Sequence, residues 1–323
     1  MESVTATFFD LVRPDLPAVE ARMRSGAELE HPSLNTAVDH LLSSGGKRIR
    51  PTLVLLTAAM LGAERDRTLT LAAAIEMLHT ASLVHDDLID KASTRRGIPT
   101  INSRWNAGAT VLTGDYIFAR AAQLAAKTGS LEVMDSFAGT LMTIVNGEIR
   151  QLLGDGAGAS RQGYMERIYA KTASLFELAT RGAGLLAQVD QRTLRDLERL
   201  GYAIGIAFQI VDDVLDFVAD EQELGKPVAS DLRHGLITLP TLYYLEDAGS
   251  DPVIDSILQG KRVDDGAFDR LVQAIRTSGA VDQSLAEARQ VINQGIEVLA
   301  SMPISAEREA LRDLTEYVIQ RTI

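Results

Sequence analysis

The apolar positions of the chain repeat at the spacing of an α-helix. One stripe comprises Leu197, Leu200, Ile204, Phe208, Val211 and Leu215, which are separated by steps of three or four residues. A second comprises Leu71, Ile75, Leu78, Ser82 and Ile89 and predicts a helix over about residues 69–91. A third, Leu311, Leu314 and Val318, predicts a C-terminal helix. Convincing strand alternation is absent from the sequence, so we expect an all-α chain of about ten or more helices.

Glycine-rich or polar breaks interrupt this pattern at helix-sized intervals. They lie at residues 43–46, 97–99, 154–160, 225–227 and 248–252. None is long or biased enough to be a linker between domains. We therefore expect one large helical domain spanning residues 1–323.

The sequence contains neither a recognisable targeting segment nor a membrane span. The first thirty residues mix acids, bases and two prolines, whereas a signal peptide has an uninterrupted apolar core. The longest apolar stretches, residues 51–62 and 203–211, are shorter than the roughly 20 residues that cross a bilayer. We expect a cytoplasmic protein with no transmembrane segment.

Composition narrows the function classes. The chain has 44 acidic and 32 basic residues and a net charge of −12, which disfavours a chain-wide electrostatic grip on nucleic acid. Any anionic ligand therefore needs a local basic pocket. The absence of cysteine excludes disulfides, thiolate metal sites and cysteine nucleophiles, and it fits a reducing compartment.

Two clusters of aspartates share one spacing. The first is Asp86, Asp87 and Asp90, and the second, 126 residues later, is Asp212, Asp213 and Asp216. In each, the first and last aspartates are one helical turn apart and share a face. A single cluster of this kind is typical of a solvated acidic face. Two copies on predicted core helices indicate a function, because like charges at this spacing destabilise a helix unless something compensates them.

Aspartate oxygens are hard ligands. Because no cysteine or paired histidine accompanies them, they favour Mg²⁺ over zinc. Mg²⁺ usually keeps several waters and is completed by substrate phosphates. Two acidic helix faces that lie opposite each other would bind a diphosphate through Mg²⁺. The two clusters therefore predict a phosphorylated substrate.

Basic residues concentrate in two short segments. Residues 43–51 place Lys47, Arg48 and Arg50 beside a glycine pair, and Arg95 and Arg96 follow the first aspartate cluster. Glycine lets the backbone approach an anion, and arginine suits phosphate oxygens. The first segment is not a Walker A loop, because residues 41 and 48 do not fit that motif. Alone, the segment would favour a solvated basic turn at a helix start.

Together, these motifs resemble the trans-polyprenyl diphosphate synthases, the enzymes of head-to-tail isoprenyl chain elongation. The matching segments are residues 45–51, 76–90, 95–99, 112–116, Gly147-Glu148 with Gln151, Lys171-Thr172, 208–216 and 224–227. The resemblance extends from about residue 34 to 245, and both the order and the separations of the segments fit.

The resemblance implies an all-helical isoprenoid synthase fold, a single bundle around a deep central cavity. It implies that about two to three Mg²⁺ ions bind the allylic diphosphate. Their ligands would be Asp86, Asp90 and Asp212, supported by Asp87, Asp213 and Asp216. Arg95, Lys171 and Lys226 would contact the allylic diphosphate, and Lys47, Arg50, His79 and Arg96 would bind isopentenyl diphosphate. Thr172 and Gln209 would stabilise an allylic cation. The same resemblance implies a homodimer.

Two positions fall outside this set of roles. Relatives often carry a lysine after the segment that corresponds to Asp231–Gly235, but here Leu236 follows it, which leaves a final lysine contact without a residue. His85 has no role in the resemblance, and we expect an ordinary hydrogen-bonded helix histidine.

Product length depends on the turn before Asp86. Family members that make farnesyl products close the cavity with bulky aromatics there, whereas Ala81 and Ser82 are small. By resemblance this favours a long-chain product of roughly seven to ten isoprene units, as in octaprenyl, solanesyl and decaprenyl synthases, for a quinone side chain. The alternative is that Ala81 and Ser82 merely permit helix packing while Met77 ends the cavity at geranylgeranyl or shorter products.

Three other classes are weaker matches. A terpene cyclase shares the first cluster, but its second metal site differs from Asp212, Asp213 and Asp216, and it lacks an isopentenyl site like Lys47 and Arg50. A di-iron oxidoreductase is suggested by two Glu-x-x-His segments, at residues 28–31 and 76–79, but Pro32 disfavours a helix through the first. Two intact aspartate clusters disfavour a non-catalytic scaffold.

Overall fold

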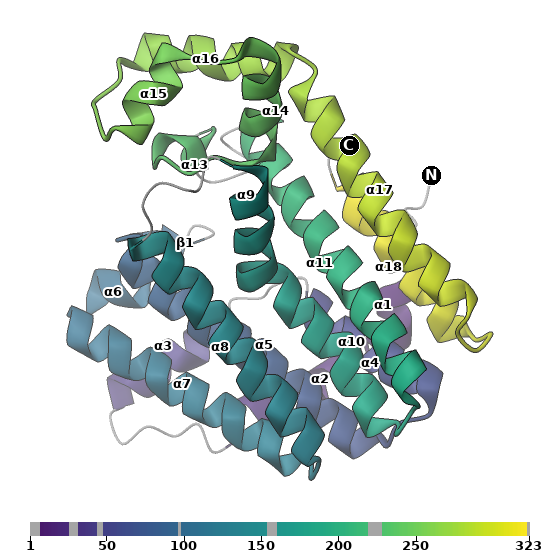
Figure 1. The fold of residues 1–323 in the computed structure, drawn as a ribbon. Helices are drawn as coiled ribbons and strands as arrows, with labels where there is room; N and C mark the ends of the chain where they lie inside the picture. Colours follow the sequence, from purple (N-terminus) through teal and green to yellow (C-terminus); the bar gives the residue numbers. More distant parts are fainter. Residues whose placement is uncertain are drawn as a thin grey trace. The chain divides into compact units, whose positions relative to one another are not determined.

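The computed structural model describes residues 7–25, 32–43, 48–95, 98–153, 160–218 and 228–321, and these are predominantly helical (Figure 1). The helices of the first half are α1 (Thr7–Val12), α2 (Leu16–Arg24), α3 (Pro32–Ser43), α4 (Ile49–Leu61), α5 (Arg65–Ile89), α6 (Ile101–Arg104), α7 (Ala107–Lys127) and α8 (Leu131–Leu153). Those of the second half are α9 (Arg161–Ile168), the π-helical η3 (Tyr169–Ala173), α10 (Ser174–Leu186), α11 (Gln191–Val218), α13 (Ser230–Arg233), α14 (Leu239–Ala248), α15 (Pro252–Leu258), α16 (Asp265–Thr277), α17 (Ala280–Ala300) and α18 (Ala306–Gln320). The all-α prediction is confirmed.

One antiparallel hairpin interrupts the helices. Strands β1 (Thr94–Arg95) and β2 (Ile98–Pro99) pair Thr94 with Pro99 and Arg95 with Ile98. The sequence analysis found no strand, because two residues are too few to show alternation. This hairpin determines the position of Arg95.

The chain divides into two compact units. Unit 1 comprises residues 1–142, 175–201 and 298–314, and unit 2 comprises residues 143–174, 202–297 and 315–323. The first aspartate cluster belongs to unit 1 and the second to unit 2. The single domain over residues 1–323 and its deep central cavity stay predictions.

In unit 1, α5 is the central helix and packs against α7, α4 and α2 (Figure 1). Leu71, Ile75 and Leu78 are fully buried, as their spacing predicts. Ile89, which belongs to the same stripe, is exposed because α5 ends there. The helix therefore carries the Asp86–Asp90 cluster at its C-terminal end, beyond its buried apolar face.

In unit 2, the second half of α11 supplies the core. Ile204 and Val211 are fully buried, as the helical stripe predicts. The side chain of Arg276 in α16 donates from Nε to the Phe217 carbonyl oxygen at 2.6 Å, so α16 holds the C-terminal end of α11. The predicted C-terminal helix is α18, whose Leu314 and Val318 are fully buried.

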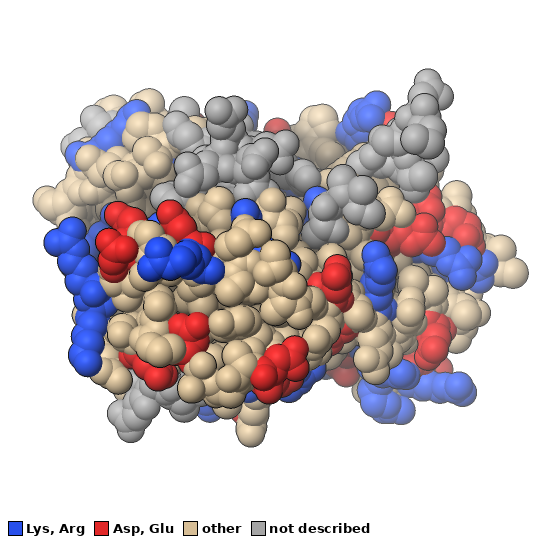
Figure 2. Space-filling model, turned by 90° about the horizontal axis from the view of Figure 1, so that it is seen from above, with Lys and Arg blue, Asp and Glu red and all other residues tan. Residues whose placement is uncertain are grey.

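Charge is distributed in small groups over the surface. On the face in Figure 2, acidic and basic side chains are interspersed among uncharged residues. Within the part of the chain that the structure describes, no helix has the length and apolarity needed to cross a membrane.

Candidate active site

The first aspartate cluster lies at the C-terminal end of α5. Asp86 and Asp87 are buried, whereas Asp90 is exposed at the helix cap. Carboxylates are unfavourable at this end of a helix, because its free carbonyl groups carry partial negative charge. The cluster therefore needs positive charge from elsewhere in the molecule.

Arg95 supplies part of that charge. Its Nε donates to Asp87 Oδ1 at 2.8 Å, across the turn that leads from α5 to β1. Burial raises the pKa of Asp87, and Arg95 opposes this without cancelling it. The structure thus joins two predicted site residues, a metal ligand and a diphosphate-binding arginine.

The second aspartate cluster lies in α11 with the reverse pattern of exposure. Asp212, its first member, is exposed, whereas Asp213 and Asp216 are buried. The side chain of Arg321 reaches to 4.0 Å from Asp212. Asp216 Oδ2 accepts from the Asp231 backbone N–H at 3.1 Å, which holds α13 against α11.

Neutral donors surround Asp213. Its Oδ2 accepts from the Tyr164 hydroxyl at 2.8 Å, and its Oδ1 accepts from Gln209 Nε2 at 2.8 Å. Burial raises the pKa of Asp213 to about 8, repulsion from Asp231 and Asp212 adds to this, and the two hydrogen bonds oppose it. Burial and Asp213 together raise the pKa of Tyr164 well above its usual value, so its hydroxyl keeps its proton.

The π-helical segment η3 carries Lys171 and Thr172. A π turn contains one extra residue and is frequent at functional sites. Thr172 Oγ1 donates to Gln209 Oε1 at 2.6 Å, and Lys171 Nζ lies 3.0 Å from Glu148 Oε1 in α8. Gly147 makes room for the segment, because a Cβ there would lie 2.6 Å from the Ala170 Cβ.

The predicted isopentenyl diphosphate residues are only partly described. Lys47, Arg96 and Lys226, the last from the allylic set, lie outside the described residues. Arg50, at the start of α4, lies over the Phe176 ring at 4.9 Å. His79 is partly exposed in α5 and accepts from Ser82 Oγ at its carbonyl oxygen.

Arg48, which the sequence grouped with these cations, is engaged inside the protein. Its guanidinium donates to Glu76 at 2.7 Å, to Glu20 at 3.2 Å and to the Leu42 carbonyl oxygen at 2.6 Å. Both Arg48 and Glu76 are largely buried. Arg48 therefore links α2, α3 and α5, and this role accounts for its charge.

The residues around the proposed product wall differ in exposure. Met77 and Ala81 are fully buried in α5, and Ser82 is half-buried. Their role in product length stays a prediction.

His85 and Leu236 have local partners. His85 Nε2 lies 3.2 Å from the Val111 carbonyl oxygen and 3.4 Å from Asp115, so it is a hydrogen-bonded helix histidine, as predicted. The Leu236 backbone N–H donates to the Asp231 carbonyl oxygen at 2.9 Å.

Among the described residues, no three carboxylate or imidazole side chains form a ready-made metal cage. Mg²⁺ binds through one or two carboxylates and completes its shell with water and phosphate oxygens. The buried and exposed aspartates of each cluster are a donor set of that kind.

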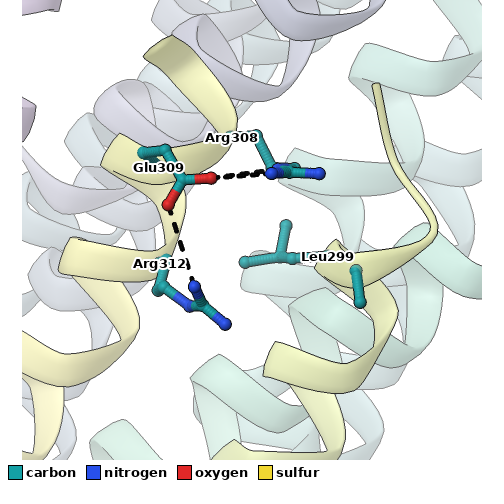
Figure 3. Close-up of a pocket in the computed structure, with 5 residues that line it drawn as sticks. Leu299, Arg308, Glu309 and Arg312 are labelled. Atoms are coloured by element: carbon teal, nitrogen blue, oxygen red, sulfur yellow. Dashed lines mark hydrogen bonds and ion pairs between the residues drawn. The ribbon is translucent and has the colours of Figure 1, made fainter. Parts of the chain in front are cut away.

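A cavity of about 180 Å³ lies between the C-terminal end of α17 and the first half of α18, and its lining residues belong to unit 1 (Figure 3). Arg308 and Arg312 both approach Glu309 there, at 2.8 and 3.8 Å, with Leu299 beside them. None of its lining residues belongs to the set that the sequence predicts.

The sequence analysis missed Tyr164, and it placed Glu148 in a matching segment without giving it a role. Tyr164 lies on a helix whose polar side chains form no repeated pattern, so spacing alone did not reveal it. A usable signal was the position of Tyr164 on a core helix, because a buried tyrosine hydroxyl needs a partner.

Comparison with known proteins gives consistent matches. The family model described as polyprenyl synthetase matches residues 31–275. Heptaprenyl diphosphate synthase component 2 of Geobacillus stearothermophilus is 36% identical, and the match covers 97% of this chain and 98% of the relative. The crystal structure of a decaprenyl diphosphate synthase from Rhodobacter capsulatus is 33% identical with a TM-score of 0.90, and the match covers 98% of both chains. A polyprenyl synthase from Caulobacter crescentus, solved with calcium and isoprenyl diphosphate, is 32% identical with a TM-score of 0.92, over 99% of this chain and 98% of that one.

Proposed function

This chain belongs to the polyprenyl synthetase family, and from that premise we propose that it adds isopentenyl diphosphate head-to-tail to an allylic diphosphate such as farnesyl or geranylgeranyl diphosphate. Family membership makes the chain a Mg²⁺-dependent prenyltransferase. Two of the relatives named above are called heptaprenyl diphosphate synthase component 2 and decaprenyl diphosphate synthase, which supports a long-chain all-trans product here, for a quinone side chain.

The observation that carries the proposal is the framework of unit 2. Hydrogen bonds connect the second aspartate cluster to Gln209 and Thr172, and Lys171 is the neighbour of Thr172 on η3. Metal-binding carboxylates, a cation for the diphosphate and oxygen dipoles for a carbocation thus share one rigid support. Such preorganisation is what an ionising reaction requires.

The residue roles form part of the proposal. Asp86, Asp90 and Asp212 hold about two to three Mg²⁺ ions, with Asp87, Asp213 and Asp216 in support. Mg²⁺, when bound, neutralises charge on the diphosphate leaving group. The Caulobacter synthase, solved with calcium and isoprenyl diphosphate, supports a divalent cation together with a diphosphate ligand.

Arg95, Lys171 and Lys226 bind the allylic diphosphate and stabilise it as the carbon–oxygen bond breaks. The oxygens of Thr172 and Gln209 stabilise the allylic cation. Lys47, Arg50, His79 and Arg96 hold isopentenyl diphosphate so that its double bond attacks that cation. The departing diphosphate then accepts the proton that is lost from the new chain.

A direct test is incubation of the purified protein with Mg²⁺, isopentenyl diphosphate and farnesyl diphosphate, followed by mass spectrometry of the product. The expected result is a polyprenyl diphosphate of roughly seven to ten isoprene units. Farnesyl diphosphate alone is the control, because a cyclase would convert it to hydrocarbon. Hydrocarbon formation, or no elongation with both substrates present, would contradict the proposal.

The small residues before Asp86 explain the long product. Ala81 is fully buried one turn from Asp86, so an aromatic ring there would fill space near the allylic site. We expect Ala81→Phe to shorten the product by several isoprene units, as measured by mass spectrometry. An unchanged chain length would show that another residue, such as Met77, forms the wall.

We further propose a cytoplasmic homodimer. On α8, Met142, Val145, Ile149 and Leu152 follow one another at helical spacing and are all exposed, between 42% and 64%. A stripe of this kind on one helix favours association. We expect Ile149→Asp to produce monomers in light scattering, whereas Leu258→Asp, at an exposed apolar position on α15, leaves the mass unchanged. A monomeric unmodified protein would contradict the proposal.

A further inference from the structure

Four side chains of unit 2 form a continuous hydrogen-bonded chain. It runs from Tyr164 in α9 to Asp213 and Gln209 in α11 and ends at Thr172 in η3. The three contacts are 2.8, 2.8 and 2.6 Å long. Tyr164, Asp213 and Thr172 are each no more than 5% exposed, and Gln209 is half-buried.

In this hydrogen-bonded series, the hydrogen bonds are directed from Thr172 to Gln209, from Gln209 to Asp213, and from Tyr164 to Asp213. Tyr164 and Gln209 both donate to Asp213, so Gln209 turns its NH₂ group toward Asp213 and its Oε1 toward Thr172. Thr172 then donates its hydroxyl proton to Gln209, and its lone pairs face away from Gln209. Tyr164 holds the second oxygen of Asp213 and thereby fixes the carboxylate that sets this direction.

We propose that Tyr164 is a positioning residue for the condensation, acting through Asp213 and Gln209 to orient the Thr172 hydroxyl. This inference rests on the proposed function, in which the Thr172 oxygen stabilises the allylic cation. With Tyr164 in place, the negative end of the Thr172 hydroxyl dipole points to the cation. Without it, the Asp213 carboxylate and the Gln209 amide turn more freely, and the dipole is no longer fixed when the cation forms.

The backbone around Thr172 supports such a role. Ser174 Oγ donates to the Ala170 carbonyl oxygen at 2.9 Å, and Gly147 of α8 lies against Ala170. Because these contacts hold η3 in place, the remaining freedom near the cation is the rotation of the Thr172 hydroxyl. The hydrogen-bonded series that begins at Tyr164 restricts that rotation of the Thr172 hydroxyl.

The variant Tyr164→Phe deletes one oxygen and keeps the ring. We expect kcat for elongation of farnesyl diphosphate to fall about tenfold. The KM for isopentenyl diphosphate should change less than about twofold, because none of the described residues proposed to bind it contacts Tyr164 or Asp213. Tyr244→Phe is the matched control, because its hydroxyl also donates to a carboxylate, Asp251, at 3.0 Å but lies outside the chain. We expect the control to keep the kcat of the unmodified enzyme.

A thermodynamic cycle separates positioning from general support of the fold. In a Thr172→Val background, Tyr164→Phe should cause no further loss of kcat, because the hydroxyl that it orients is absent. In a Thr172→Ser background, which restores the hydroxyl, Tyr164→Phe should again lower kcat about tenfold. Thermal unfolding of every variant establishes that each is folded at the assay temperature.

The inference is overturned if Tyr164→Phe keeps kcat within about twofold of the unmodified enzyme, or if its effect is the same in the Val and Ser backgrounds. It is also overturned if added Mg²⁺ restores the rate, since Asp213 would then act on the metal alone. If the unmodified protein makes no elongated product, the proposed function fails instead. The two failures are therefore distinguishable.

Discussion

The two aspartate clusters share a sequence spacing but are stabilised in different ways. On α5, an arginine from the β1–β2 hairpin forms an ion pair with the buried Asp87. On α11, the buried Asp213 and Asp216 accept hydrogen bonds from Tyr164, Gln209 and the Asp231 backbone, all of them neutral donors. Burial raises the pKa of Asp87 and of Asp213, so neither arrangement fully compensates the loss of water.

This difference separates two tasks. The ion pair places a cation, Arg95, beside the first cluster, where the proposed function needs one for the diphosphate. The neutral network leaves Arg321, 4.0 Å from Asp212, as the cation beside the second cluster among the ion pairs described above, but it fixes the orientation of the Asp213 and Asp216 side chains. We infer that, in the proposed function, the α5 cluster serves to bind Mg²⁺ and the diphosphate. The α11 cluster serves both to bind them and to align the side chains that are hydrogen-bonded to it.

The largest expected effect comes from removing, in either cluster, a carboxylate that the proposed function assigns to the metal. We expect Asp86→Asn and Asp212→Asn each to lower kcat/KM about a thousandfold or more, because several kcal/mol of charge stabilisation at the leaving group is lost. Steady-state assays of elongation measure this. Asp135→Asn, at an exposed position on α8, is the control and should be unaffected. If only one cluster proved sensitive, the two would not share a diphosphate.

A smaller effect on activity is expected from a substitution at Gly147, where α8 packs closely against η3. In Gly147→Ala, the new methyl group would lie 2.6 Å from the Ala170 Cβ and must displace the segment that carries Lys171 and Thr172. We expect kcat to fall about tenfold to a hundredfold, because small displacements of catalytic groups are costly. Gly139→Ala is a matched control on the same helix, where an added Cβ meets nothing within 4 Å. It should keep its activity and gain about 0.5–1 kcal/mol of stability in chemical denaturation. Equal activity in the two variants would mean that η3 tolerates the shift.

The smallest effect is a pH dependence of stability in the metal-free protein. The ordinary pKa of an aspartate is 3.8 and the pKa of Asp213 in the fold is about 8, so the folded state holds the proton more tightly than the unfolded state. A raised pKa contributes stability that is fully present below the unfolded value and is lost as pH rises through the folded value. The contribution of Asp213 therefore decreases between about pH 4 and pH 8. Urea unfolding over this range should show a negative slope that Asp213→Asn reduces.

Added Mg²⁺ sharpens that measurement. A bound cation near Asp212 favours the ionised form of Asp213, so excess Mg²⁺ should also reduce the slope in the unmodified protein. A slope that persists in both Asp213→Asn and excess Mg²⁺ would assign the pH dependence to other groups, Asp87 among them.

Much of the fold could be predicted from the sequence, because a helix with one buried face has apolar residues at regular three- and four-residue spacing. The stripe from Leu197 to Leu215 and the apolar side of α5 correspond to real helices, and both aspartate clusters lie on them. The hairpin at residues 94–99 and the π turn of η3 were not predictable in this way. A two-residue strand is too short to show alternation of apolar and polar residues. A single π turn adds one residue to a helix and leaves no distinctive residue pattern in the sequence.

The site was predictable as a set of residues but not as a set of contacts. Spacing and resemblance identified Asp213, Gln209 and Thr172, yet the partner that fixes Asp213 is Tyr164, 49 residues earlier in the chain. Arg48 shows the opposite case, because its place in a basic segment suggested anion binding while the fold uses it to neutralise Glu76.

The sequence by itself determined the helices, the two aspartate clusters and the reaction class, because periodicity and motif spacing are local properties of the chain. Only the tertiary structure decided which aspartates are buried, which donors reach them and how their pKa values move. Those properties depend on side chains that folding brings together from distant segments, and on the water that it removes between them.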